Sequence, residues 1–297
     1  MAKSDDLFLG ADGGGTRCRV RLARGSGAIL GEAEAGPANL RLGVREAFAA
    51  VLDGAQKCLG DAGLPPTALE RITACLALAG ASEPAARARA SEHHLPFHRT
   101  ILVTDAEAAC IGAHPDDDGG IIVIGTGSIG WAIVGGKQYR IGGWGLPLSD
   151  EGSGAWLGRE VLRRVLSAHD GRLGWTPLLE EVFARFDHDP HAIVRWTAEA
   201  KPGDYGGFAP LVVARAAQSD EAGGALIRLA AGHIDALARR LVAIGAARIA
   251  LSGGLACGIE PYLAAATRRH LVSPQGDALA GALLIATGGV RCDERRA

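Results

Sequence analysis

The chain has 297 residues, of which 48% are apolar and 22% are charged, with a formal net charge of −2. This length predicts about two domains of a globular protein, at roughly 150 residues each. The near-neutral charge predicts no nucleic-acid partner and no association with an anionic membrane. The first residues lack the apolar core and cleavage pattern of a signal peptide, so a cytoplasmic location is expected.

The cysteines and the longest uncharged stretch both allow a second interpretation. Residues 119–136 carry no charge and are about long enough to span a bilayer, but glycines interrupt them, so we interpret them as two buried strands. The cysteines are scattered without a CxxC pair, which favours buried free thiols in a reducing cytosol over disulfides. They are Cys18, Cys58, Cys75, Cys110, Cys257 and Cys292.

The first part of the chain predicts a three-stranded meander followed by alternating helices and strands. Short apolar runs between glycine turns indicate strands, and apolar residues at spacings of three and four indicate helices. The expected strands are 7–11, 18–23, 28–33, 71–79 and 100–104, and the expected helices are 43–62, 84–92 and one beginning at Asp105.

The second part repeats this order around one large addition. The expected elements are strands 120–125, 129–134 and 137–141, a helical insertion at 153–245, strand 248–252, helix 261–268, strand 270–272 and a closing helix from about 276. Gly135-Gly136 is a predicted hairpin turn. The repeat predicts an α/β protein built by internal duplication, with two like lobes around a cleft. The expected domains are 1–117 and 118–275, with a hinge near 115–120 and the closing helix, about 276–290, packed on the first lobe.

The first of two glycine-rich turns follows the apolar strand that ends at Asp12. It consists of Gly13, Gly14, Gly15 and Thr16. Bare glycine amides can approach phosphate oxygens closely, which predicts a phosphate site, although an ordinary hairpin turn is the alternative. The turn lies between two strands, and no GxxxxGK[ST] motif occurs, so a Walker loop is excluded. Asp12 would hold Mg²⁺ directly or through water.

The second glycine-rich turn contains Gly125, Thr126 and Gly127. With Gly130 it formally matches GxGxxG, but a dinucleotide fold requires a helix after the glycines, and this sequence predicts a strand. Two such turns suggest two lobes that hold one polyphosphate, as in a nucleotide-using enzyme.

Asp105 follows the apolar strand 100–104 directly. A carboxylate at the carboxyl end of a strand is well placed to act as a general base. It is equally well placed to cap the helix that begins there. The residues alone leave both interpretations open.

The segment 142–154 is a glycine-dense loop that carries Trp144 and two adjacent carboxylates, Asp150 and Glu151. Ionised oxygens accept hydrogen bonds from sugar hydroxyls, so we interpret the loop as a ligand site. The alternative is a helix N-terminus with acidic residues in its first turn. Gly253 and Gly254 end another strand, where contact with a nucleoside and a plain tight turn are both open.

Two histidine groups and one acidic run are interpreted as surface features. Neither histidine group has zinc-ligand spacing with helix support, and the acidic run is most simply a solvated linker. The groups are His93, His94 and His98; His188, Asp189 and His191; and Asp116, Asp117 and Asp118.

Taken in order, these motifs resemble those of the acetate kinase/sugar kinase/Hsp70/actin superfamily. The closer resemblance is to the BadF/BadG-type ATPase family, which contains the N-acetylglucosamine kinases, and it covers nearly the whole chain. The motifs that carry it are 11–16, 36–39, 104–106, 125–128, 143–145, 149–153 and 252–254. The stretches 136–138, 168–171 and 204–210 are similar to bacterial glucosamine kinases.

The resemblance implies a duplicated ribonuclease-H-like fold with an interdomain cleft, and ATP-dependent phosphorylation of the 6-hydroxyl of N-acetylglucosamine or glucosamine. It assigns the base to Asp105, and the sugar contacts to Asn39, Trp144, Asp150 and the backbone of Gly127. It assigns phosphate binding to Gly13, Gly14, Gly15, Thr16 and Thr126, and the nucleoside to Gly253 and Gly254. Related kinases imply a homodimer.

Two other functions are alternatives to the kinase. A BadF-type ATPase activator would need cysteines for an iron–sulfur cluster, and no cysteine pair here has suitable spacing. A non-catalytic sugar sensor often carries a helix-turn-helix, for which a first strand starting by Leu7 leaves no room, and Asp12 and Asp105 are intact. The choice between glucosamine and N-acetylglucosamine is open, since an ammonium group favours a carboxylate near C2 and an acetyl group favours a small apolar pocket.

Overall fold

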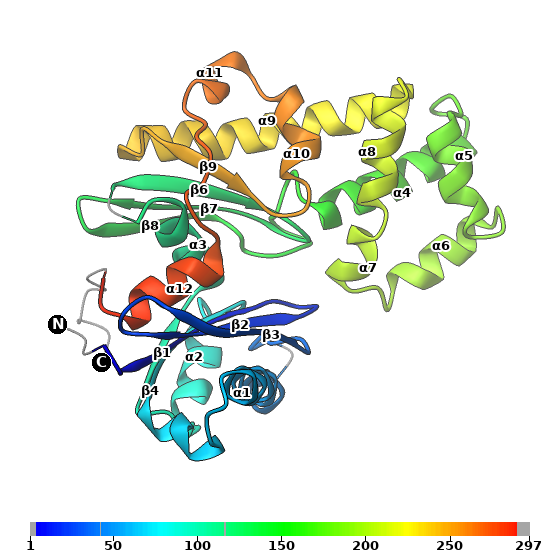
Figure 1. Cartoon of the computed structure of the whole chain (residues 1–297). Coiled ribbons are helices and arrows are strands. Elements are labelled where there is room, and N and C mark those ends of the chain that lie inside the picture. Colours follow the sequence, from blue (N-terminus) through cyan, green and yellow to red (C-terminus); the bar gives the residue numbers. More distant parts are fainter. Residues whose placement is uncertain (1–3, 42, 116, 290–297) are drawn as a thin grey trace. The chain divides into compact units, whose positions relative to one another are not determined.

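The computed structural model describes residues 4–41, 43–115 and 117–289. The predicted linker residue Asp116, the last residue of the predicted closing helix and Cys292 lie outside these residues. The chain divides into two compact units. One consists of the described parts of Met1–Asp118 and Ser273–Ala297, and the other is Gly119–Val272. Each unit has its own sheet (Figure 1).

The first unit is a five-stranded sheet with the order β3-β2-β1-β4-β5. β1, β2 and β3 form an antiparallel meander, and β4 and β5 extend the sheet in parallel with β1. The strands are β1 (Leu7–Gly13), β2 (Cys18–Arg24), β3 (Ile29–Ala35), β4 (Ile72–Leu78) and β5 (Arg99–Val103). These five strands confirm the predicted order.

The helices of the first unit pack on its sheet or on one another (Figure 1). They are α1 (Val44–Asp61), the 3₁₀ helix η1 (Pro66–Arg71), α2 (Pro84–Ser91), α3 (Asp105–Ala113) and α12 (Ala278–Ala286). α1 contacts β2 and β3 and buries Val44, Phe48 and Val51, which lie on its predicted apolar face. Burial of such side chains is the main stabilising contribution, at about 25 cal/mol per Å² of apolar surface.

α12 lies against β1 and against α3 at unusually short distance. A Cβ at Gly281 would collide with the Ala108 carbonyl of α3, and a Cβ at Gly112 would collide with the Asp277 carbonyl. Glycine at both positions therefore lets the two helix backbones meet. α12 begins after Asp277, whose Oδ1 accepts a hydrogen bond from the Ala280 N–H at 3.0 Å.

The second unit is a four-stranded sheet with the order β8-β7-β6-β9. β6 (Gly119–Ile124), β7 (Ser128–Val134) and β8 (Lys137–Gly142) are antiparallel, and β9 (Ile249–Ser252) runs parallel to β6. The predicted hairpin at Gly135 and Gly136 is confirmed, since φ is 57° and 73° at these residues, as a type I′ turn requires.

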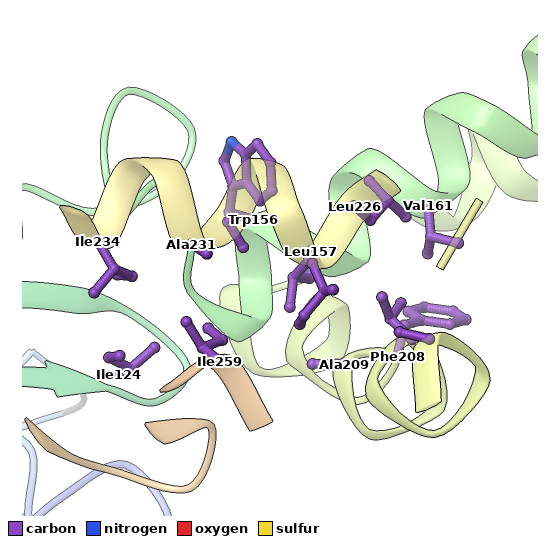
Figure 2. Packing of buried hydrophobic residues seen from close by; sticks show 14 of the residues in the cluster. Ile124, Trp156, Leu157, Val161, Phe208, Ala209, Leu226, Ala231, Ile234 and Ile259 are labelled. Atoms are coloured by element: carbon purple, nitrogen blue, oxygen red, sulfur yellow. The ribbon is translucent and has the colours of Figure 1, made fainter. Parts of the chain in front are cut away.

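Six helices fill the predicted insertion between β8 and β9. They are α4 (Gly154–His169), α5 (Pro177–Ala184), α6 (Pro190–Thr197), α7 (Pro202–Gly206), α8 (Ala209–Ala217) and α9 (Glu221–Ile244). α9 packs on the sheet through β6, β7 and β8. Figure 2 shows Leu157 of α4 and Leu226 of α9 packed in the same buried cluster as Ile124 of β6.

Two predicted elements near the end of the second unit are wrong. The segment predicted as helix 261–268 is divided between η2 (Glu260–Tyr262) and α11 (Ala265–Arg268), and another short helix, α10 (Ala256–Ile259), precedes them. Leu263 and Ala264 are extended between η2 and α11, and the Ala264 N–H donates to the buried Asp235 carboxylate at 3.2 Å, which removes it from a helical ladder. The predicted strand 270–272 is reduced to a single bridge between Leu271 and Ile249.

Within the described residues, no helix combines the length and the apolar character needed to cross a bilayer. Among the described residues, Cys18, Cys58, Cys75 and Cys110 are buried and lie outside any disulfide, as predicted, whereas Cys257 is exposed, contrary to the prediction.

Candidate functional site

The first group of predicted site residues gathers at the carboxyl ends of the parallel strands in the first unit. Asp12 is the penultimate residue of β1, and Asp105 lies two residues after the end of β5. Asn39 forms a parallel bridge with Ala79, which follows β4. We call Asp12, the glycine turn 13–16, Asn39 and Asp105 the acidic cluster. In α/β sheets the carboxyl ends of parallel strands are the usual place for ligands.

Asp12 is held by an ion pair across the β1–β2 hairpin. Its Oδ2 accepts a hydrogen bond from Arg19 Nη2 at 2.7 Å, and the two residues are register partners in the sheet. The side chain of Asp12 is 22% exposed. Mg²⁺ in phosphate-transfer sites needs only one or two carboxylates besides phosphate and water oxygens, so the donor type at Asp12 suits this ion. Among the described residues, no group of three or more His, Cys, Asp or Glu side chains forms a metal cage.

The glycine turn has one glycine that the fold requires and two that it does not. Gly13 is buried, and a Cβ there would lie 2.7 Å from the Ala38 Cβ. Gly14 and Gly15 have no contact closer than 3.8 Å at a Cβ position, and neither has a positive φ. The position of a Gly15 Cβ would be 4.0 Å from Asn39 Nδ2, so the amide lies beside the turn. Neighbour packing therefore does not explain why Gly14 and Gly15 are glycine.

Asp105 is the first residue of α3 rather than its cap. The cap is Thr104, whose Oγ1 accepts a hydrogen bond from the Glu107 N–H at 3.0 Å. Asp105 Oδ1 accepts one from the Ala106 N–H at 2.9 Å. The pKa of Asp105 is raised, mainly by burial. The hydrogen bond from the Ala106 N–H lowers this pKa, the negative charge of Asp12 raises it further, and the positive charge of Arg41 lowers it. The cap of α3 is therefore Thr104 and not Asp105, so the helix-cap interpretation of Asp105 is wrong.

The second glycine turn lies at the N-terminus of α4 in the second unit. The Gly154 N–H donates to the Gly125 carbonyl at 2.8 Å, and the Ala155 N–H donates to the Thr126 carbonyl at 3.1 Å. β7 follows the turn directly, so the predicted absence of a dinucleotide-type helix is confirmed. We call the turn 125–128 and Gly253 and Gly254 the glycine cluster.

Two other segments of the second unit lie beside the turn 125–128. Gly253 has a φ of 94° and packs against the backbone of Ile124, and the Leu255 N–H donates to the Ile124 carbonyl at 3.0 Å. The position of a Gly206 Cβ would be 3.8 Å from the Thr126 side chain. Gly206 has no predicted role, and the only signal for it in the sequence is the 204–210 resemblance.

The loop 143–153 joins β8 to α4 and carries Trp144 and Asp150. Arg140 donates to the carbonyls of Gly142, at 3.1 Å, and of Gly143, and its guanidinium lies 4.0 Å from the centroid of the Trp144 ring. Trp144 is 69% exposed. Asp150 has a φ of 65°, and its Oδ1 accepts a hydrogen bond from the Gly145 N–H at 3.0 Å.

Gly127 meets this loop, because a Cβ there would lie 2.5 Å from Asp150 Oδ2. The structure thus places Gly127 and Asp150, which are both expected to contact the sugar, beside each other. Arg140 and Arg159 were missed by the sequence analysis. Arg159 Nη1 donates to the Pro147 carbonyl of the loop at 3.0 Å. No motif marked either arginine.

Comparison with known proteins identifies relatives along nearly the full chain. The sequence model of the BadF/BadG/BcrA/BcrD ATPase family matches residues 9–286. Glucosamine kinase GspK of Vibrio cholerae is 40% identical over 281 residues, which cover 95% of this chain and 96% of that protein. An N-acetylmuramic acid/N-acetylglucosamine kinase of Clostridium acetobutylicum is 31% identical over 169 residues, 55% of each chain.

Solved structures show the same fold. A protein from Chromobacterium violaceum, provisionally assigned as an N-acetylglucosamine kinase, is 36% identical with a TM-score of 0.89, covering 96% of this chain and all of that one. A ROK family glucokinase from Streptomyces griseus, in complex with glucose and AMPPNP, has a TM-score of 0.57 at 18% identity, covering 95% and 99%. These likenesses confirm the predicted duplicated α/β fold class.

Proposed function

Because the chain belongs to the BadF/BadG/BcrA/BcrD ATPase family, as its motifs predict, we propose that it is an ATP-dependent amino-sugar kinase. It transfers the γ-phosphate of ATP to the 6-hydroxyl of glucosamine or N-acetylglucosamine. The observation that carries this proposal is the 40% identity with a glucosamine kinase over 95% of the chain. Glucosamine is therefore the substrate that we expect to react fastest.

Asp105 acts as the general base in this proposal. Its carboxylate accepts the proton of the sugar 6-hydroxyl as the oxygen attacks the γ-phosphorus, and the bond from that phosphorus to the bridging oxygen of ADP breaks. A base is most effective when its pKa lies near the working pH, and burial moves the pKa of Asp105 in that direction. The Nδ2 group of Asn39 donates to a sugar hydroxyl.

Asp12 and the turn 13–16 serve the phosphates in this proposal. Asp12 would hold Mg²⁺ directly or through water, and that ion neutralises charge on the phosphate oxygens when bound. Gly14, Gly15 and Thr16 present their N–H groups and the Thr16 hydroxyl to the phosphate oxygens. This role is supported by the room around Gly14 and Gly15, since no neighbouring atom lies closer than 3.8 Å to a Cβ position at either residue.

The second unit contributes sugar and nucleotide contacts in this proposal. Trp144 offers an exposed aromatic face, and Asp150 and the Gly127 backbone bind sugar hydroxyls. Thr126 binds phosphate, and Gly253 and Gly254 lie by the nucleoside. We also expect a homodimer in the cytoplasm.

The test is the release of ADP from Mg-ATP, first alone and then with glucosamine, N-acetylglucosamine, N-acetylmannosamine or glucose. Release that depends on an amino sugar, with phosphate found on O6, would support the kinase. ADP release that occurs without sugar, and that does not change when any of the four sugars is added, would instead support the ATPase activator. Sugar binding without any ADP release would support the sensor.

A further inference from the structure

Arg19 contacts two carboxylates that are far apart in the sequence. On β2 its guanidinium donates through Nη2 to Asp12 Oδ2 and through Nη1 to Asp277 Oδ2, each at 2.7 Å. The side chains of Arg19 and Asp277 are 32% and 45% exposed. The group is thus a chain of three charges in which Arg19 is the central member.

Asp277 is a fixed partner because its backbone is held on both sides. It caps α12, and α12 cannot shift easily, since the backbones of Gly281 and Ala108 touch. A Cβ at Gly10 of β1 would also lie 2.9 Å from the Leu283 N of α12. The end of α12 therefore provides a rigid anchor for one arm of the Arg19 guanidinium.

We propose that Arg19 is a positioning residue that fixes the Asp12 carboxylate for the metal–nucleotide, and that Asp277 fixes Arg19 in turn. This inference rests on the proposed role of Asp12. Arg19 occupies Oδ2 of Asp12 and so directs Oδ1 toward incoming ligands. Only a planar guanidinium can donate to two carboxylates from separate nitrogens in a fixed geometry, so lysine cannot replace it fully.

Arg21 provides a matched control two residues along the same strand. Its Nε donates to Glu32 Oε1 at 2.8 Å, and its side chain is 22% exposed. It therefore makes a cross-strand ion pair of similar length from the same face of β2, but its partner is the more exposed Glu32 and not Asp12. A purely structural role for such pairs predicts similar behaviour of Arg19 and Arg21 variants.

The experiment compares Arg19→Gln, Arg19→Lys, Asp277→Asn and Arg21→Gln in the full chain. Binding of Mn²⁺ with ADP is measured by electron paramagnetic resonance, the half-saturating Mg²⁺ concentration and sugar KM by kinetics, and folding by Tm. Groups that orient a metal ligand typically change affinity by about 10–100-fold when removed. We expect Arg19→Gln to weaken Mn²⁺ binding and raise half-saturating Mg²⁺ in this range, with sugar KM within about twofold.

The other variants decide between positioning and stability. Arg19→Lys should recover part of the loss, Asp277→Asn should give a smaller loss, and Arg21→Gln should leave metal binding unchanged. Equal Mn²⁺ affinity in Arg19→Gln and wild type, or equal losses in Arg19→Gln and Arg21→Gln, would overturn the inference. A wild-type protein that binds Mn²⁺–ADP but phosphorylates no sugar would reject the kinase, while the Mn²⁺ comparison would still test Arg19.

Discussion

The glycine turn between β1 and β2 and the glycine turn between β6 and β7 occupy the same point of two repeated meanders. The residue before the first glycine is Asp12 in one and Ile124 in the other. Asp12 is ion-paired with Arg19 and partly exposed, whereas Ile124 is fully buried in the core of its unit. The same strand–turn–strand path therefore carries a carboxylate in only one of its two copies.

The two turns also differ in their hydrogen bonds and in their exposure to solvent. The N-terminus of α4 donates two hydrogen bonds to carbonyls of the second turn, while Gly15 and Thr16 of the first turn are exposed. Duplication thus supplies a backbone scaffold twice, and the acid–base and metal chemistry that we propose depends on side chains present in one copy. This agrees with the general rule that function resides in sites and not in folds.

The largest expected effect in this comparison comes from Asp105. Asp105→Asn should lower kcat by about 10²–10⁴-fold, the usual contribution of a general base, while Mg-ATP still binds. The control is Thr104→Ala, which removes the α3 cap and should lower stability by about 1 kcal/mol with a much smaller loss of kcat. Near-normal turnover of the asparagine variant would remove Asp105 from the role of base.

The same substitution should raise stability at neutral pH. The pKa of Asp105 is higher in the folded protein than in an unfolded chain, first because of burial. Its contribution to stability is therefore present when it is protonated and is lost as pH rises through the folded pKa. Asp105→Asn should have a higher Tm than wild type at pH 7, and this difference should shrink toward pH 4, near the pKa of an unfolded aspartate at about 3.9. A Tm advantage that does not change with pH would contradict the assigned cause.

Glycine substitutions sharpen the comparison of the two turns. Gly14→Ala and Gly15→Ala add a methyl group that makes only ordinary van der Waals contacts, so Tm should change little. KM for Mg-ATP should rise at least about tenfold, since hydrogen bonds to charged groups contribute about 1.5–3 kcal/mol. Gly127→Ala should instead displace Asp150 and raise the sugar KM. An unchanged KM for Mg-ATP in both Gly14→Ala and Gly15→Ala would contradict the proposed phosphate-binding role of the first turn.

The matched control for the turn is Gly60→Ala. Gly60 lies near the end of α1 and also has open space at its Cβ position. Alanine there should raise stability by about 0.5–1 kcal/mol without changing either KM. A rise in KM for Mg-ATP in Gly60→Ala would show that the turn variants report a general effect of added methyl groups.

The strands and the candidate residues of the acidic cluster could be predicted from local pattern. Asp12 and Asp105 follow buried apolar runs, and parallel strands bring such ends together. The break at Leu263 could not be predicted, because it depends on Asp235, a buried carboxylate almost 30 residues earlier that takes the Ala264 N–H. Arg19 and Arg159 were missed for the same reason, since their partners are set by tertiary contacts.

The smallest expected effect concerns the loop that carries Trp144. Arg159 and Arg163 both pair with Glu160 at 3.1 Å, and Arg159 also donates to the Pro147 carbonyl of the loop at 3.0 Å. Arg159→Gln should raise the sugar KM by about three- to tenfold, as expected for one lost hydrogen bond of about 0.5–1.5 kcal/mol, and leave KM for Mg-ATP unchanged.

Arg163→Gln is the matched control for this loop contact. It removes a Glu160 ion pair from a more exposed side chain, 70% against 30% for Arg159, and exposed pairs contribute about 0–1 kcal/mol. Its sugar KM should equal that of wild type. If both variants raise the sugar KM equally, the charge of Glu160 is responsible. If neither does, the loop is held without Arg159, by the hydrogen bonds of Arg140 to Gly142 and Gly143 and of Asp150 to Gly145.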